Sequence, residues 1–137
     1  MPDECDRIVS ILQNRLVHYR CEFFDRLRNV LAQDLIQLRV VHGQPSRTDE
    51  TKNDVGSLPW TTPVHNLYFP CRGVEVIWQP VFRSVRDSDL VIFTQENRIL
   101  SNYPFIFNRM MGKTRPKIAF WGHGVNFQSL WLLFLPH

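Results

Sequence analysis

The stretch that decides the fold is Arg7–His42, RIVSILQNRLVHYRCEFFDRLRNVLAQDLIQLRVVH. Its first part, Arg7–Leu12, is a short apolar run that predicts a β-strand, and its last part, Leu35–His42, predicts a second one. Between them, Glu22–Gln33 carries apolar side chains at the spacing of one helix face. A strand, a helix and a strand within about 35 residues form a βαβ unit, which requires the two strands to pair in parallel.

The second half of the chain continues this alternation. Leu90–Thr94 (LVIFT) predicts a buried strand, Ile99–Met111 predicts a helix that begins near Pro104, and Lys117–Trp121 (KIAFW) predicts a further strand. Shorter elements are expected at residues 66–69 and 74–78 (strands) and 81–87 (one or two helical turns). Apolar strands that alternate with helices predict an α/β fold, with a Rossmann-like, doubly wound, mainly parallel sheet.

Two segments fall outside this pattern. Gly43–Pro63 is rich in turn-forming residues, lacks periodicity and is expected to be a long, mobile surface loop. Leu130–Leu135 (LWLLFL) is too short to span a bilayer. We therefore expect one domain over residues 1–128, followed by an apolar tail, 129–137, that marks a truncated or altered end. Contact of this tail with a membrane surface is the alternative.

Composition and charge narrow the class of protein. The net charge is +3, and residues 71–137 contain eight basic and only four acidic side chains. Such a bias suits phosphate groups or an anionic membrane surface, although a solvated basic face explains it equally well. The three cysteines have no zinc-site spacing, so no metal site is expected and a reducing compartment is favoured. The acidic start of the chain does not resemble a signal peptide, which predicts a cytoplasmic location.

Polar residues follow every predicted strand of the sheet. Because parallel strands bring their carboxyl ends to one edge, these residues predict a crevice for a polar ligand at that edge. The alternative is that loops are polar for other reasons. The strand ends are Gln13-Asn14-Arg15, His42-Gly43-Gln44, Thr94-Gln95-Glu96-Asn97 and Gly122-His123-Gly124.

His123 is the most prominent of these residues because it lies between two glycines directly after a buried strand. Glycines permit a tight turn and a close approach of backbone to ligand, and histidine can move a proton near neutral pH. A purely structural histidine is the competing interpretation. Arg15 and Arg20 flank the expected helix N-terminus, where anions are favoured, and Asn14 and Asn126 can bind hydroxyl groups or cap turns. Glu96 is a weak candidate general base.

The order and spacing of these pieces resemble the N-terminal domain of bacterial family-4 (GT-B type) glycosyltransferases. The resemblance covers roughly residues 7–128, and its pieces are QNRLVHYR (13–20), FFDRL (23–27), VVHG (40–43) and FWGHG (120–124). It implies an acceptor-binding Rossmann-like domain that faces a second, donor-binding domain across a cleft. No phosphate-binding GxxxxGK[ST] loop and no GxGxxG motif after the first strand is present, which argues against P-loop enzymes and typical dehydrogenases.

The resemblance also implies roles for particular residues. His123 would be the catalytic residue facing the transferred sugar, and the substrate-binding residues would be Asn14, Arg15, His18, Arg20, Gly122, Gly124 and Asn126. The co-substrate would be a nucleotide sugar, the acceptor a glycan or a lipid-linked sugar, and no other cofactor and no nucleic acid would be involved. The motifs of the family's donor-binding domain are missing from the chain, so the polypeptide is expected to be inactive alone.

Two other functions remain open. The chain can be a non-enzymatic Rossmann-like binding or interaction module. With either function, the exposed face where a second domain would pack predicts an apolar patch and self-association. A small nucleic-acid-binding domain is disfavoured, because Tyr103, Phe105, Phe107 and Trp121 fit a core better than a stacking surface.

Overall fold

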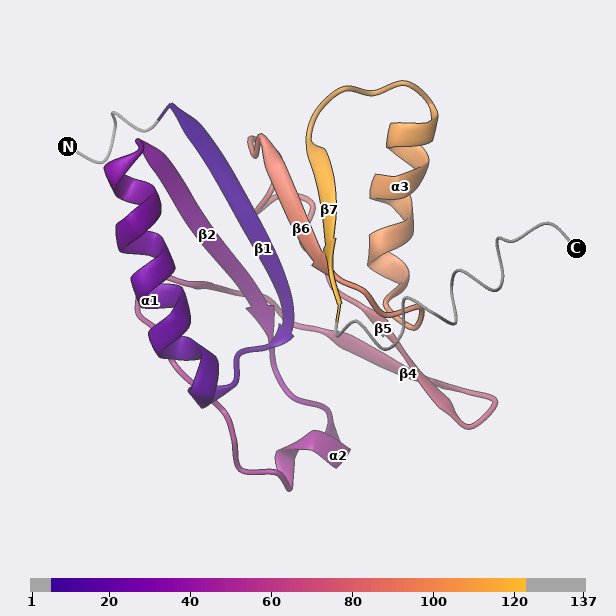
Figure 1. Cartoon of the computed structure of the whole chain (residues 1–137). Helices are drawn as coiled ribbons and strands as arrows, with labels where there is room; N and C mark the ends of the chain where they lie inside the picture. The colour runs from indigo at the N-terminus through magenta and orange to yellow at the C-terminus, as the bar shows by residue number, and fades with distance from the viewer. Residues whose placement is uncertain (1–5, 123–137) are drawn as a thin grey trace, which may run out of the picture.

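The computed structural model describes residues 6–122, which form an α/β domain around a five-stranded sheet (Figure 1). The strand order is β3-β2-β1-β6-β7, and each neighbouring pair is parallel. These strands are β1 (Arg7–Arg15), β2 (Ile36–Gly43), β3 (Thr62–Pro63), β6 (Leu90–Thr94) and β7 (Lys117–Trp121). The predicted fold class, a Rossmann-like and mainly parallel sheet, is confirmed.

Helices cover both faces of the sheet, as a doubly wound fold requires (Figure 1). They are α1 (His18–Gln33) and α3 (Tyr103–Met110). Side chains of a strand point alternately to its two faces, so neighbouring residues enter different cores. Ile11 packs with the fully buried Phe24 of α1, whereas Leu12 packs with Phe93 and with Phe105 of α3.

The remaining elements are small. A hairpin of β4 (Leu67–Cys71) and β5 (Val74–Trp78) pairs antiparallel and projects from one end of the sheet (Figure 1). Its turn is formed by Arg72 and Gly73, which both have positive φ angles, as tight hairpins prefer. A 3₁₀ turn, Leu100–Asn102, leads into α3, and a short helix, α2, covers Arg47–Glu50. Residues 82–87 form turns, close to the expected helical turns.

The boundaries at the start of the chain differ from the prediction. β1 continues past Leu12 to Arg15 because it stays paired with β2 across an irregularity between Gln13 and Arg15. α1 begins at His18, not at Glu22, so His18 and Arg20 belong to the first turn of the helix and not to a loop before it.

Residues 43–63 were expected to be a long, mobile surface loop, and most of the segment is indeed irregular, but it is more ordered than a plain loop. The segment contains α2 and β3, and Leu58 and Trp60 pack against the core beneath α1. It also pairs with the start of α1, because the amide of His18 donates to the carbonyl of Asp54 at 2.8 Å and the amide of Gly56 donates to Leu16 at 2.8 Å. Among residues 6–122, no helix has the length and apolar character needed to cross a membrane.

Candidate functional site

The chain changes direction in the sheet between β1 and β6. It leaves β1 through α1 towards β2 on one side, and later returns to place β6 on the other side. Open α/β sheets bind ligands at the carboxyl edge beside such a reversal. A crevice of about 220 Å³ lies there, which we call the switch-point crevice. It is lined by Gln13, Asn14, Arg15, Val17, Tyr19, Arg20, Lys52, Thr94, Glu96 and Arg98.

Positive charge dominates this crevice, because Glu96 is the acidic residue in its lining beside three arginines and one lysine. The arginines are held by polar neighbours. Arg20 donates to the Gln13 side-chain oxygen at 2.6 Å, and Arg98 donates to Glu96 at 2.7 Å. Arg15 forms an ion pair with Asp54, and this hydrogen bond lowers the pKa of the Asp54 carboxyl. The guanidinium groups are therefore oriented before any ligand arrives.

The N-terminus of α1 adds to this positive field. The helix starts after Val17 without a side-chain cap, and its first turn contains no acidic residue. Val17, Tyr19 and Arg20 line the crevice, so the positive end of the helix dipole lies beside it. The Arg20 guanidinium lies 5.1 Å from the ring centroid of Trp121, which connects the helix start to the end of β7.

Three buried amide oxygens near the same edge lack a hydrogen-bond partner within the described part of the chain. They are Oδ1 of Asn14, at the end of β1, Oε1 of Gln95, directly after β6, and Oδ1 of Asn66, whose amide nitrogen donates to the Asn14 carbonyl. A buried acceptor left unpaired is costly, so such groups often mark a place where a ligand or water donates a hydrogen bond. Acceptors beside cations suit a ligand that carries both hydroxyl and phosphate groups.

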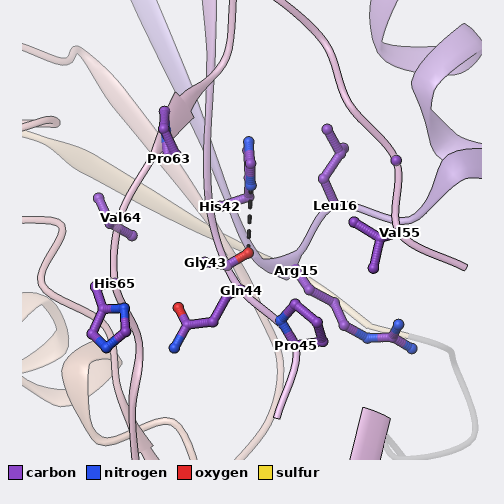
Figure 2. A pocket seen from close by; sticks show the side chains of 11 residues that line it. Arg15, Leu16, His42, Gly43, Gln44, Pro45, Val55, Pro63, Val64 and His65 are labelled. Atoms are coloured by element: carbon purple, nitrogen blue, oxygen red, sulfur yellow. Dashed lines mark hydrogen bonds between the residues drawn. The ribbon is translucent and has the colours of Figure 1, made fainter. Parts of the chain in front are cut away.

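A second hollow, of about 350 Å³, lies on the other side of Arg15, at the ends of β2 and β3 (Figure 2). We call it the histidine cavity. Its lining is more apolar than that of the crevice. It consists of Arg15, Leu16, His42, Gly43, Gln44, Pro45, Val55, Gly56, Pro63, Val64 and His65. Arg15 belongs to both linings, so the two hollows are neighbours along one edge of the sheet.

His42 is the half-buried titratable group of this cavity. Its Nε2 lies 2.9 Å from Oγ1 of Thr61, and that hydroxyl donates its proton to the Leu58 carbonyl. Nδ1 lies 3.4 Å from the carbonyl of Gly43 (Figure 2). Burial lowers the pKa of His42 below its usual value, although the Gly43 contact opposes this effect. The imidazole is therefore neutral near pH 7 and able to donate through Nε2.

The structure brings together three of the predicted site residues. Asn14, Arg15 and Arg20 all line the switch-point crevice. His18 lies outside its lining: the side chain is exposed, with Nδ1 3.3 Å from the Asp54 carbonyl. Gly122 follows β7 at the same sheet edge, whereas His123, Gly124 and Asn126 lie outside the described residues. The prediction that His123 and Arg15 share one rim therefore stays a prediction.

Several residues of this edge were not predicted as site residues. Lys52 and Asp54 come from residues 43–63, which have no periodic pattern from which their position follows. Arg98 lies two residues after Glu96, just beyond the strand end that the sequence singles out. The position of His42 at a strand end was visible in the sequence, but its pairing with Thr61 was not.

No group of three His, Cys, Asp or Glu side chains within residues 6–122 is arranged to hold a metal ion. The chain matches no protein-family model, no curated protein and no solved structure. Its function therefore has to be argued from the fold and from the chemistry of the carboxyl edge.

Proposed function

We propose that the switch-point crevice binds the phosphate and sugar groups of a nucleotide sugar or a glycosylated acceptor, as the acceptor-side half of a glycosyltransferase. The observation that carries this proposal is the convergence of Arg15, Arg20, Lys52 and Arg98 beside the N-terminus of α1. Cations and a helix dipole at a strand reversal favour phosphate groups. The unpaired oxygen of Asn14 provides an acceptor for a sugar hydroxyl.

In this proposal the described residues bind and orient, and they do not perform the transfer step. Arg15 and Arg20 hold the phosphate oxygens, because guanidinium groups match them in shape and charge. His123 faces the transferred sugar only by resemblance to the family. The polypeptide would act in the cytoplasm, at or near the inner membrane.

The proposal is tested by titrating the full chain with uridine diphosphate, inorganic pyrophosphate and UDP-glucose in a calorimeter. We expect saturable binding. Arg15→Ala and Arg20→Ala should each weaken it by about 10-fold to 100-fold, which corresponds to the free energy of one hydrogen bond to a charged group. Arg26→Ala is the matched control, since Arg26 is an exposed arginine of the same helix that pairs with Glu22 at 2.7 Å. Asp54→Asn removes the carboxylate that competes for Arg15, so it should tighten binding.

The outcome separates the transferase half from the non-enzymatic binding or interaction module. Binding that is lost with either crevice arginine and kept in Arg26→Ala supports the transferase half. Equal affinities for the wild type and the crevice variants, or no saturable binding of any of the three probes, would overturn the proposal. The second function, an interaction module, is favoured by the large exposed apolar side chains of the β4–β5 hairpin, Leu67, Phe69 and Val74.

A further inference from the structure

The outward face of α3 is apolar, whereas the solvent-facing side of a surface helix is usually polar or charged. Phe107 is 61% exposed and Met110 is 80% exposed. The expectation that Tyr103 and Phe107 belong to the core was therefore wrong, whereas Phe105 is buried as expected. They belong to a set of exposed apolar side chains at helical spacing, opposite the buried Phe105, which we call the α3 stripe. It consists of Leu100, Tyr103, Phe107, Met110 and Met111. A contiguous apolar surface of this kind usually marks a site of contact.

The surroundings of the stripe are basic. Residues 97–122 contain five basic side chains and no acidic one. Arg109 and Lys113 are exposed at the carboxyl end of α3, where Arg109 donates to the Lys113 carbonyl at 3.0 Å. Lys117 is exposed at the start of β7, whereas Arg115 is paired with Asp89 at 2.5 Å. These exposed cations are thus close in sequence to the stripe on α3, the helix that covers the face of the sheet opposite α1 (Figure 1).

We propose that the α3 stripe docks on the surface of an anionic lipid membrane. Apolar side chains that enter the headgroup boundary and basic side chains that meet anionic headgroups are the two features of helices that lie on a membrane. The eight residues of α3 are far fewer than the ~20 needed to span a bilayer, so the helix lies on the membrane and does not cross it.

Charge favours this partner over the other candidates. A second copy of the chain, docked through the same face about a two-fold axis, would bring two basic surfaces together. The chain's own residues 123–137 contain no acidic side chain that could neutralise Arg109, Lys113 or Lys117. An acidic protein surface is the competing partner, and the test below distinguishes it from a membrane. The inference is independent of the proposed sugar binding, because the stripe and the crevice share no residue.

The test is cosedimentation of the full chain with vesicles of phosphatidylcholine, with and without phosphatidylglycerol. We expect binding to the vesicles that contain phosphatidylglycerol, lost at high salt, and little binding to phosphatidylcholine alone. The double variant Phe107→Ser, Met110→Ser should bind at least about tenfold more weakly, since it removes two apolar contacts. Lys113→Gln combined with Lys117→Gln should abolish the preference for phosphatidylglycerol.

Matched controls come from α1, on the opposite face of the sheet. Val30→Ser changes an apolar side chain that is also exposed, and Arg26→Gln removes an exposed cation. Both should bind like the wild type, and circular dichroism checks that every variant folds. Three results would overturn the inference: no vesicle binding, binding retained by the stripe variants, or a wild-type dimer that the stripe variants convert to a monomer. Binding of an acidic protein without vesicle binding counts against it too.

Discussion

Gly56 is the point at which residues 43–63 come closest to α1, so replacing it tests whether this segment is docked there. A Cβ atom built at Gly56 would lie 2.5 Å from Sγ of Cys21, 2.8 Å from Cα of His18 and 2.9 Å from the amide nitrogen of His18. Real Cβ contacts are longer than this, and two of the three atoms belong to the backbone of a helix, which cannot rotate away. Gly56→Ala therefore forces the segment and the helix apart.

The size of the effect follows from two opposing contributions. Overpacking a filled site costs about 1–3 kcal/mol. Alanine also restricts the unfolded chain, which stabilises the folded protein by about 0.4–1 kcal/mol where the backbone conformation is allowed. The expected net loss is about 1–2 kcal/mol. For a domain of this size that corresponds to a fall in Tm of roughly 3–10 °C.

Urea and thermal denaturation followed by circular dichroism measure this change. Ser57→Ala is the control: its exposed side chain lies next along the chain, and we expect a change within about 0.5 kcal/mol. Adding Cys21→Ala to Gly56→Ala should recover only part of the loss, because the His18 backbone contacts remain. A Gly56→Ala protein as stable as the wild type would refute the docking, and complete recovery by Cys21→Ala would refute the role of the helix backbone.

Two further predictions concern the histidine cavity. At Gly43, an added Cβ would lie 2.1 Å from the side-chain amide of Asn66, which is buried and donates to the Asn14 carbonyl at 2.7 Å. Gly43→Ala should therefore lower the free energy of unfolding by about 2–3 kcal/mol, and a urea midpoint like that of the wild type would contradict this. Because burial lowers the pKa of His42, the unfolded chain binds more protons than the folded protein just below the usual value of 6.5. Stability should fall as the pH drops through this range, and His42→Gln should reduce the slope; an unchanged slope in urea titrations at several pH values would count against the reasoning.

The centre of the fold was predictable because its strands are marked by strong local patterns. β6 and β7 have the predicted bounds, because each contains a run of four apolar residues. β7 was expected to be a buried strand, which was wrong: it lies at the edge of the sheet, and none of its residues is buried. The helical spacing of Phe23, Phe24 and Leu27 likewise placed α1, although Phe24 alone of the three is fully buried and Phe23 is 48% exposed. Local patterns of this kind report which face of an element is buried, and burial then sets the layers of the fold.

The candidate site was predictable only in part, because its details depend on contacts between residues far apart in the chain. Gln13, Asn14 and Arg15 look like a loop by composition, yet β1 keeps them in the sheet through its pairing with β2. Asp54 reaches Arg15 across 39 positions of sequence, and no pattern in its own segment indicates this. Sequence reasoning thus predicted that the polar strand ends share one edge of the sheet, but it missed Lys52 and Asp54, which the segment 43–63 brings to that edge.

The internal ion pairs at this edge constrain what the crevice can bind. The side chains of Arg15 and Asp54 are both less than 20% exposed, and an arginine so shielded from water is stable only with a counterion. Asp54 therefore stabilises the edge when no ligand is bound. A singly charged carboxylate ligand would gain little binding free energy, because it would only replace the Asp54 carboxylate at Arg15. A diphosphate differs, because its several charged oxygens can contact Arg20 and Lys52 as well as Arg15. If the crevice binds phosphate as proposed, it should prefer diphosphate esters to simple carboxylates, and competition between pyrophosphate and acetate for the crevice tests that order directly.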